Sequence, residues 1–152
     1  MDKNIKLKVL PIPHEGVQIS LPKRATEGSA GFDLTAAISE PVTIKPNELC
    51  KIPTGIAIGL PSADYVALVF ARSGIAVKHG IALSNGVGVI DSDYRGEIQV
   101  GLCNLSNEPY TIEPGERIAQ LVVMPVCLPV IEVVNSLDQT QRGAGGFGST
   151  GK

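Results

Sequence analysis

The segment NGVGVIDSDYRGEI, residues 85–98, holds the densest group of side chains that could do chemistry. Its pattern predicts a β-hairpin in which VGVI enters, SDYRG turns and EIQVGL returns. Asp91 stands where the first strand gives way to the turn, and a carboxylate held by a rigid element suits a general base that orients water. Tyr94 could stack on a ring. The hairpin alone favours a simpler interpretation, in which Asp91 or Asp93 satisfies N–H groups of the turn.

Two further segments carry polar side chains suited to anions. In ARSGIA, residues 71–76, Arg72 offers a guanidinium fork to phosphate oxygens, Ser73 a hydroxyl, and Gly74 a bare backbone. A turn at the end of the preceding apolar strand would explain the same residues. Arg117 and Gln120 are three apart on a predicted strand, so we expect them on opposite faces. Gln120 is a polar residue in an apolar strand, so its side-chain amide needs a hydrogen-bond partner. Either another part of the protein or a substrate could supply that partner.

The glycine-rich tail RGAGGFGSTGK, residues 142–152, contains two phosphate-binding patterns, G-x-G-x-x-G and G-x-x-x-x-G-K. Each pattern works where a glycine loop follows a strand and opens a helix whose N–H groups hold the phosphates. No residues follow Lys152 in the sequence to form such a helix. We therefore expect neither a Rossmann nor a P-loop site.

The elements that must position these residues are short strands. Eleven prolines and 17 glycines divide the chain at short intervals, and no long stretch has a clean helical repeat. This spacing predicts an all-β sandwich or barrel, and among these we favour a jelly-roll-like arrangement. YVALVFA is apolar throughout, as expected of a strand buried on both faces. The predicted strands are residues 7–12, 31–35, 42–44, 51–58, 65–71, 81–83, 87–90, 97–102, 110–112, 117–125 and 131–134.

The composition indicates one globular domain and excludes several partners. The chain has 152 residues, 43% of them hydrophobic and 18% charged. The net charge of −2 gives no broad positive field for a nucleic-acid backbone, so we expect no nucleic-acid binding. No apolar run approaches the length of a membrane helix, and the N-terminus has no signal-peptide core. Cys50, Cys103 and Cys127 form no C-x-x-C pair and indicate reduced thiols in a cytoplasmic protein.

Five segments taken in order are more specific than any one of them. AGFDLTAA (30–37), ARSGIA (71–76), NGVGVIDSDYRGEI (85–98), ERIAQLVV (116–123) and RGAGGFGSTG (142–151) resemble the five motifs of the trimeric dUTPases. The resemblance covers nearly the whole chain, and the third and fifth motifs are the most specific. Ala71 stands where many members carry Gly or Pro. The resemblance implies a β domain over residues 1–136, a mobile C-terminal arm over residues 137–152, and a homotrimer with shared active sites.

The resemblance also implies an activity, dUTP diphosphatase. The enzyme would hydrolyse dUTP to dUMP and pyrophosphate, keeping uracil out of DNA and supplying dUMP for thymidylate synthesis. Asp91 would activate the water that attacks the α-phosphorus, and Tyr94 would press against the deoxyribose and exclude a 2′-hydroxyl. Mg²⁺ would be held mainly by the phosphates and waters, with Asp33 supporting it through water.

The remaining implied roles concern substrate binding. Phe147 would stack on the uracil, so the tail is expected to act as a lid, and its glycines let it wrap closely around phosphates. The uracil edge would be read by Asn85 and the backbone near Val89, Ile90 and Gln99. The phosphates would be bound by Arg72, Ser73, Gly74 and Gln120, and by Arg142, Gly148, Ser149 and Thr150 of the arm.

Three alternatives stay open at this point. A dCTP deaminase, or a bifunctional deaminase–diphosphatase, could share the fold, but Asp91, Tyr94 and the intact tail favour the hydrolase. A regulatory protein could use the nucleotide-bound state as a switch, although no long insertion separates the motifs, so this would be an added role. A purely structural β-sandwich would leave the five ordered motifs as coincidence.

Overall fold

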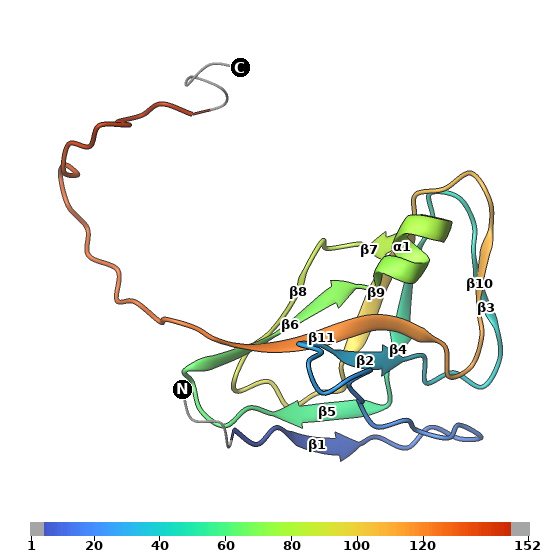
Figure 1. Cartoon of the computed structure of the whole chain (residues 1–152). Coiled ribbons are helices and arrows are strands. Elements are labelled where there is room, and N and C mark those ends of the chain that lie inside the picture. Colours follow the sequence, from blue (N-terminus) through green and yellow to red (C-terminus); the bar gives the residue numbers. More distant parts are fainter. Residues whose placement is uncertain (1–4, 147–152) are drawn as a thin grey trace.

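The computed structural model of the chain describes residues 5–146 and confirms the all-β prediction (Figure 1). Short antiparallel strands form a jelly-roll-like body, and one short helix, α1, covers one end of it. The elements are β1 (Lys8–Pro11), β2 (Phe32–Thr35), β3 (Val42–Ile44), β4 (Leu49–Pro53), β5 (Ile56–Gly59), β6 (Tyr65–Ala71), α1 (Ser73–His79), β7 (Ile81–Leu83), β8 (Gly88–Ile90), β9 (Gln99–Asn104), β10 (Tyr110–Ile112) and β11 (Arg117–Pro125).

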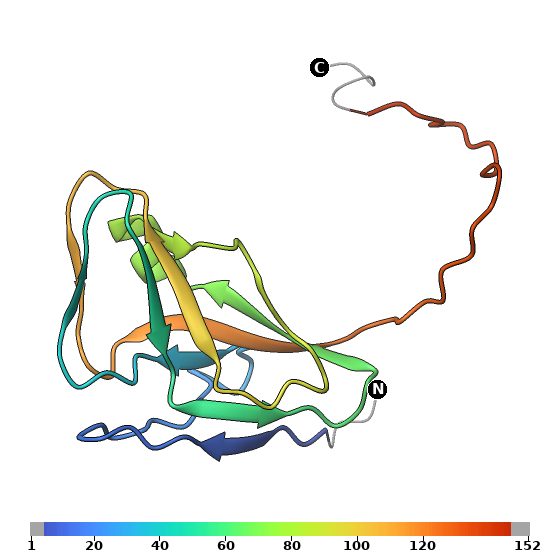
Figure 2. The same ribbon diagram turned by 180° about the vertical axis from the view of Figure 1, so that it is seen from behind.

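The strands form four small sheets with one aliphatic core cluster among them. Figure 2 shows the same body from behind. The largest sheet has the order β2-β11-β6-β8, and a second has the order β4-β9-β7. Two antiparallel pairs, β1-β5 and β3-β10, complete the body. Leu121 from the first sheet and Leu102 from the second are both 0% exposed and belong to the same core cluster. Burial of each such side chain contributes about 1.5–3 kcal/mol, so the core joins the sheets.

One predicted strand, residues 51–58, is two strands in different sheets. The chain bends at Thr54 and Gly55, and Gly55 has φ +69°, a conformation that L side chains rarely adopt. Thr54 is 1% exposed, and its hydroxyl donates to the Ile98 carbonyl oxygen at 2.6 Å. The turn therefore attaches to the segment that leads into β9.

The strand β6 has only one fully buried face, so the prediction of burial on both faces is wrong. Ala67 and Val69 face the core at 0% and 4% exposure. Val66, Leu68 and Phe70 on the other face are half-buried. The strand is central in its sheet, between β11 and β8. Its apolar outer face has no covering layer in the described part of the single chain.

The helix α1 was not predicted. Within it only Ile75 is buried, so seven residues give no helical repeat that a sequence pattern could reveal. The helix ends at Gly80, which has φ +68° and donates its N–H to the carbonyl oxygens of Ala76 and Ile75. The helix begins within the ARSGIA motif, directly after the end of β6, so the alternative of a simple turn at this strand end does not hold.

The segment after β11 leaves the body as an extended arm (Figure 1). Val126 donates its N–H to the Asp64 carbonyl oxygen at 2.8 Å, and residues 127–146 then run away from the sheets. The predicted strand 131–134 is wrong, because no strand within residues 5–146 lies beside it to pair with. Apolar side chains in and beside this segment are exposed, with Val130, Ile131 and Val133 at 95%, 88% and 92%. In the described residues, no helix has the length and apolar character needed to cross a membrane.

Candidate active site

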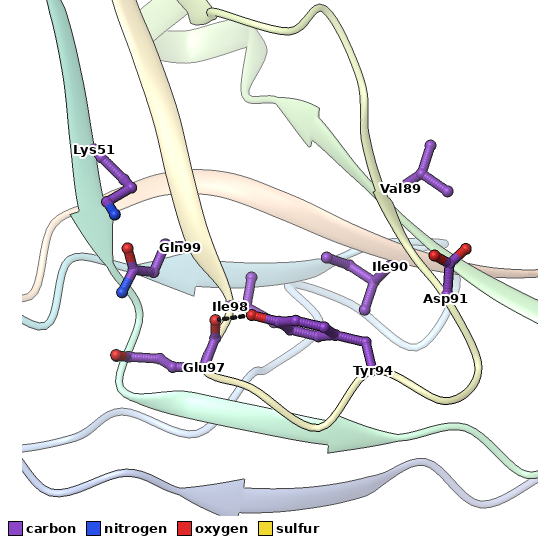
Figure 3. A pocket seen from close by; sticks show the side chains of 8 residues that line it. All are labelled: Lys51, Val89, Ile90, Asp91, Tyr94, Glu97, Ile98 and Gln99. Atoms are coloured by element: carbon purple, nitrogen blue, oxygen red, sulfur yellow. Dashed lines mark hydrogen bonds between the residues drawn. The ribbon is translucent and has the colours of Figure 1, made fainter.

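The pocket nearest the third motif lies between two strands that the sequence predicted to pair. β8 pairs with β6 in the four-stranded sheet, whereas β9 lies between β4 and β7 in the three-stranded sheet. The predicted paired hairpin is therefore wrong, because its two arms belong to different sheets. The arms are splayed, and the space between them is a pocket of about 500 Å³ (Figure 3).

Asp91 lies at the rim of this pocket, directly after the last residue of β8. It opens a tight turn, which closes when the Tyr94 N–H donates to the Asp91 carbonyl oxygen at 3.2 Å. The Asp91 and Asp93 side chains are exposed, and within residues 5–146 neither carboxylate accepts a hydrogen bond or forms an ion pair. The simpler interpretation, in which these carboxylates satisfy the turn, does not hold. The Asp91 carboxylate is free to bind water.

Tyr94 crosses the floor of the pocket from the other side of the same turn (Figure 3). Its hydroxyl donates to the Glu97 carbonyl oxygen at 3.0 Å. Its ring packs so closely on Gly96 that a Cβ there would overlap the hydroxyl and the ring. The side chain is therefore held flat in the pocket although it is 44% exposed.

The remaining lining residues are partly those that the sequence predicted. Val89, Ile90 and Gln99 line the pocket, as do Lys51, Glu97 and Ile98, which were not predicted. Glu97 and Ile98 are the last two residues of the motif and directly precede Gln99, so proximity in the sequence could have revealed them. Lys51 comes from β4 and lies beside β9 only through strand pairing, which no sequence spacing signals. Asn85 is exposed in the turn before β8 and is not among the lining residues.

A second hollow of about 370 Å³ lies where β6 meets α1, and it contains most of the predicted phosphate ligands. Arg72, Ser73, Gln120 and Asp33 line it, and Gly74 follows in the first turn of α1. The Arg72 Nε lies 2.8 Å from the Asp33 Oδ1. The Gln120 Nε2 donates to the Ala71 carbonyl oxygen at 3.0 Å, which gives this polar side chain a structural partner.

Arg117 and Gln120 do not lie on opposite faces, because β11 has a β-bulge between Arg117 and Ala119. Ile118 and Ala119 are both 0% exposed, so the alternation of faces is interrupted there. Gln120 pairs with Asp33 of β2, and the Arg117 guanidinium reaches the Asp33 Oδ2 at 3.2 Å. The bulge thus brings both side chains next to one carboxylate.

The two hollows lie at opposite ends of β6 and share no lining residue. Ile90 pairs with Ala67, so Asp91 is level with Val66, while Arg72 follows the end of the strand. Six residues of extended chain span about 20 Å, which is much longer than a triphosphate. The two hollows are therefore separate sites on one chain.

The arm contains the last group of predicted residues. Arg142 lies in a turn, in which its Nε donates to the Gly145 carbonyl oxygen at 2.9 Å, and it is exposed. The remaining predicted arm residues, Phe147, Gly148, Ser149 and Thr150, lie outside the described residues.

The fold and the order of the five motifs together define the family. Residues 17–151 match the model of the dUTPase family, and the chain belongs to that family. It is 51% identical over 148 residues to a deoxyuridine 5'-triphosphate nucleotidohydrolase of Desulfitobacterium hafniense, with 97% of each chain covered. It is 49% identical over 152 residues to the protein of the same name from Coxiella burnetii, with 100% and 99% covered.

Solved structures agree with this assignment. The chain is similar to a mutant dUTPase of Staphylococcus bacteriophage 80alpha with dUpNHpp, with a TM-score of 0.84, 28% identity, and 97% and 99% of the two chains covered. It is also similar to a mutant dUTPase of phage phi11 of S. aureus, with a TM-score of 0.74, 26% identity, and 86% and 97% covered. That second structure is described as revealing how a structural Mg(II) ion is coordinated. The resemblance seen in the sequence motifs is confirmed.

Proposed function

We propose that the chain hydrolyses dUTP to dUMP and pyrophosphate, with Asp91 as the general base for a water that attacks the α-phosphorus. The observation that carries this assignment is the Asp91 carboxylate, which is exposed at the rim of the pocket and unpaired within residues 5–146. A carboxylate without a protein partner has its lone pairs available to hold and deprotonate water. The names of the relatives favour this hydrolysis over the deaminase alternative.

The splayed arms of the hairpin suit a pyrimidine base. β8 pairs with β6 on one side, and β9 pairs with β4 from Gln99 onward but with β7 only from Leu102 onward, so backbone groups of β8 and of Gln99 and Val100 can bond to a uracil inserted between the arms. We assign this recognition to the backbone near Val89, Ile90 and Gln99, with Asn85 at the entrance. We assign the exclusion of a 5-methyl group to the same two arms, and we assign the packing against the deoxyribose to the Tyr94 ring.

The distance between the two hollows supports an active site shared between subunits. Since Asp91 and Arg72 of one chain lie about 20 Å apart along β6, the phosphates at Asp91 must meet Arg72, Ser73 and Gly74 of another subunit, with Gln120 beside them. We propose a homotrimer, as in the trimeric dUTPases. Such an assembly could bury two apolar surfaces: the half-buried outer face of β6 and the exposed apolar side chains of the arm.

The arm completes the site as a lid. We assign residues 1–136 to the β domain and residues 137–152 to an arm that closes over bound substrate. Phe147 stacks on the uracil, while Arg142, Gly148, Ser149 and Thr150 hold the γ-phosphate. Arg142 is exposed, and its fork suits phosphate oxygens. Closure excludes water, which strengthens each charge interaction with the phosphates.

The family resemblance assigns Asp33 a supporting role for Mg²⁺ through water. Its Oδ1 and Oδ2 are each paired with a guanidinium, of Arg72 and Arg117, so in the described residues Asp33 positions these two arginines and offers no unpaired oxygen to a hydrated cation. When bound, Mg²⁺ neutralises charge on the phosphates. The chain's own residues position the substrate and move the proton. We place this activity in the cytoplasm, because free cysteines are typical of a reducing compartment.

Release of pyrophosphate from dUTP, dTTP, dCTP and UTP in the presence of Mg²⁺ tests the assignment. We expect turnover of dUTP and little turnover of the other three. Ammonia released from dCTP would support the deaminase alternative, and equal turnover of all four nucleotides would contradict recognition of uracil and deoxyribose in this pocket.

A further inference from the structure

The carboxylate of Glu97, a residue that lines the pocket, joins three separate segments of the chain. The Glu97 Oε1 accepts the Gly55 N–H at 2.7 Å and lies 2.8 Å from the His14 Nε2. The Glu97 side chain is only 14% exposed, and that of His14 is 29% exposed. To bond to a carboxylate, the Nε2 must carry the hydrogen, which holds for one neutral tautomer and for the imidazolium. The loop after β1, the β4–β5 turn and the hairpin therefore meet at one oxygen.

The same residue holds the ring of Tyr94. The Glu97 carbonyl oxygen accepts the Tyr94 hydroxyl at 3.0 Å (Figure 3). Tyr94 is 44% exposed, so burial alone does not select one rotamer for it. Besides the contact with Gly96, this hydrogen bond determines where the ring lies. A shift of Glu97 moves the acceptor and, with it, the ring.

The neighbouring residue is anchored from the core. The Ile98 N–H donates to the Ile56 carbonyl oxygen at 2.8 Å, and the Ile98 carbonyl accepts the Thr54 hydroxyl at 2.6 Å. Ile98 is 1% exposed. Glu97 is one residue closer to the open turn, and His14 is the side chain that reaches it from the outer loop. This contact is therefore the one that can be removed without disturbing the core.

We propose that His14 and Glu97 are positioning residues that hold the Tyr94 ring in place and so set the discrimination between deoxyribose and ribose. The inference rests on the proposed placement of the sugar against Tyr94. A ring that is free to tilt opens space for a 2′-hydroxyl, whereas a ring tied to Glu97 does not. Asp91 is on the other arm of the hairpin, so the chemical step is largely unaffected.

The ratio of kcat/KM for dUTP to kcat/KM for UTP tests the proposal. In His14→Ala we expect the ratio to fall about fivefold, because one charge-assisted hydrogen bond on Glu97 is lost. The kcat for dUTP should stay within about twofold, and the change should appear in KM. His14→Gln keeps a donor for Glu97 and should restore most of the ratio. Glu15→Ala, at an exposed neighbouring position, is the matched control and should leave the ratio unchanged.

A double-mutant cycle shows whether the effect passes through the hydroxyl of Tyr94. Tyr94→Phe removes that hydroxyl, so adding His14→Ala to it should lower the ratio no further. A ratio unchanged by His14→Ala, or lowered equally in both backgrounds, would overturn the positioning role. Tyr94→Ala separates this failure from failure of the proposed function. If that variant also leaves the ratio unchanged, the sugar does not lie against Tyr94. If it lowers the ratio, the placement stands and only the His14–Glu97 inference is lost.

Discussion

Replacement of Asp91 by Asn should separate catalysis from folding. The carboxylate is exposed and accepts no hydrogen bond within residues 5–146, so its loss should change the free energy of unfolding by less than about 0.5 kcal/mol. Asn has a similar shape but cannot take a proton from water. General-base catalysis is worth about 10²–10⁴-fold, so kcat should fall by that factor. The corresponding rise in the activation barrier is about 2.7–5.4 kcal/mol.

The assay is steady-state release of pyrophosphate from dUTP, with affinity measured separately using a non-hydrolysable analogue. Affinity should stay within about one order of magnitude, because Asp91 contacts the attacking water rather than the base or sugar. Asp93→Asn is the matched control, since Asp93 is exposed in the same turn and is equally unpaired there. An unchanged kcat in Asp91→Asn, or an equal loss in the control, would refute the assignment.

Three further predictions concern the arm and two titrating groups. Deleting residues 142–152 should leave a folded trimer with very poor turnover, by mass in solution and pyrophosphate release, and full turnover would show that the arm is not a lid. Cys127 is exposed, whereas burial raises the pKa of the Cys50 thiol, so a thiol reagent should modify Cys127 first, and equal rates would contradict this. Burial and the Glu116 carboxylate raise the pKa of Tyr110 to about 12, from 10.0. The folded state then keeps a proton that the unfolded state loses, so the free energy of unfolding should fall from pH 10 towards pH 12. Urea titrations should show a smaller fall in Tyr110→Phe, and an identical fall would contradict the assigned cause.

Local patterns predicted most of the strands but not the breaks between them. β3, β6, β7, β10 and β11 begin and end where their apolar runs do, because turn residues bound them. The break at Gly55 requires a positive φ. Glycine permits this conformation but adopts others equally well, so a glycine in the sequence does not by itself predict a break. The segment 131–134 has the composition of a strand, yet strand formation needs a pairing partner, which the described part of the single chain does not supply there.

The site could be predicted in part, because each motif carries its own chemistry but not its place in space. The prediction that Asp91 follows the end of its strand is confirmed, because the strand end and the turn after it depend on residues that are adjacent in the sequence. The paired hairpin was wrong because the assignment of β8 and β9 to different sheets depends on β6 and β4, which are distant in sequence. The bulge in β11 likewise reversed the expected faces of Arg117 and Gln120. Lys51 and His14 reach the pocket region through tertiary contacts alone.

The separation of the two hollows along β6 has a genetic consequence. A subunit that lacks the Asp91 carboxylate still contributes an intact Arg72 to the site of a neighbour. A subunit that lacks Arg72 still contributes the Asp91 general base. Under the proposed sharing of sites, the variants Asp91→Asn and Arg72→Ala are each inactive alone, but an equal mixture should regain activity when the subunits exchange. With random assortment, about a quarter of the sites contain both an intact Asp91 and an intact Arg72. Defects in different motifs of this chain would then complement each other, whereas two defects in the same hollow would not.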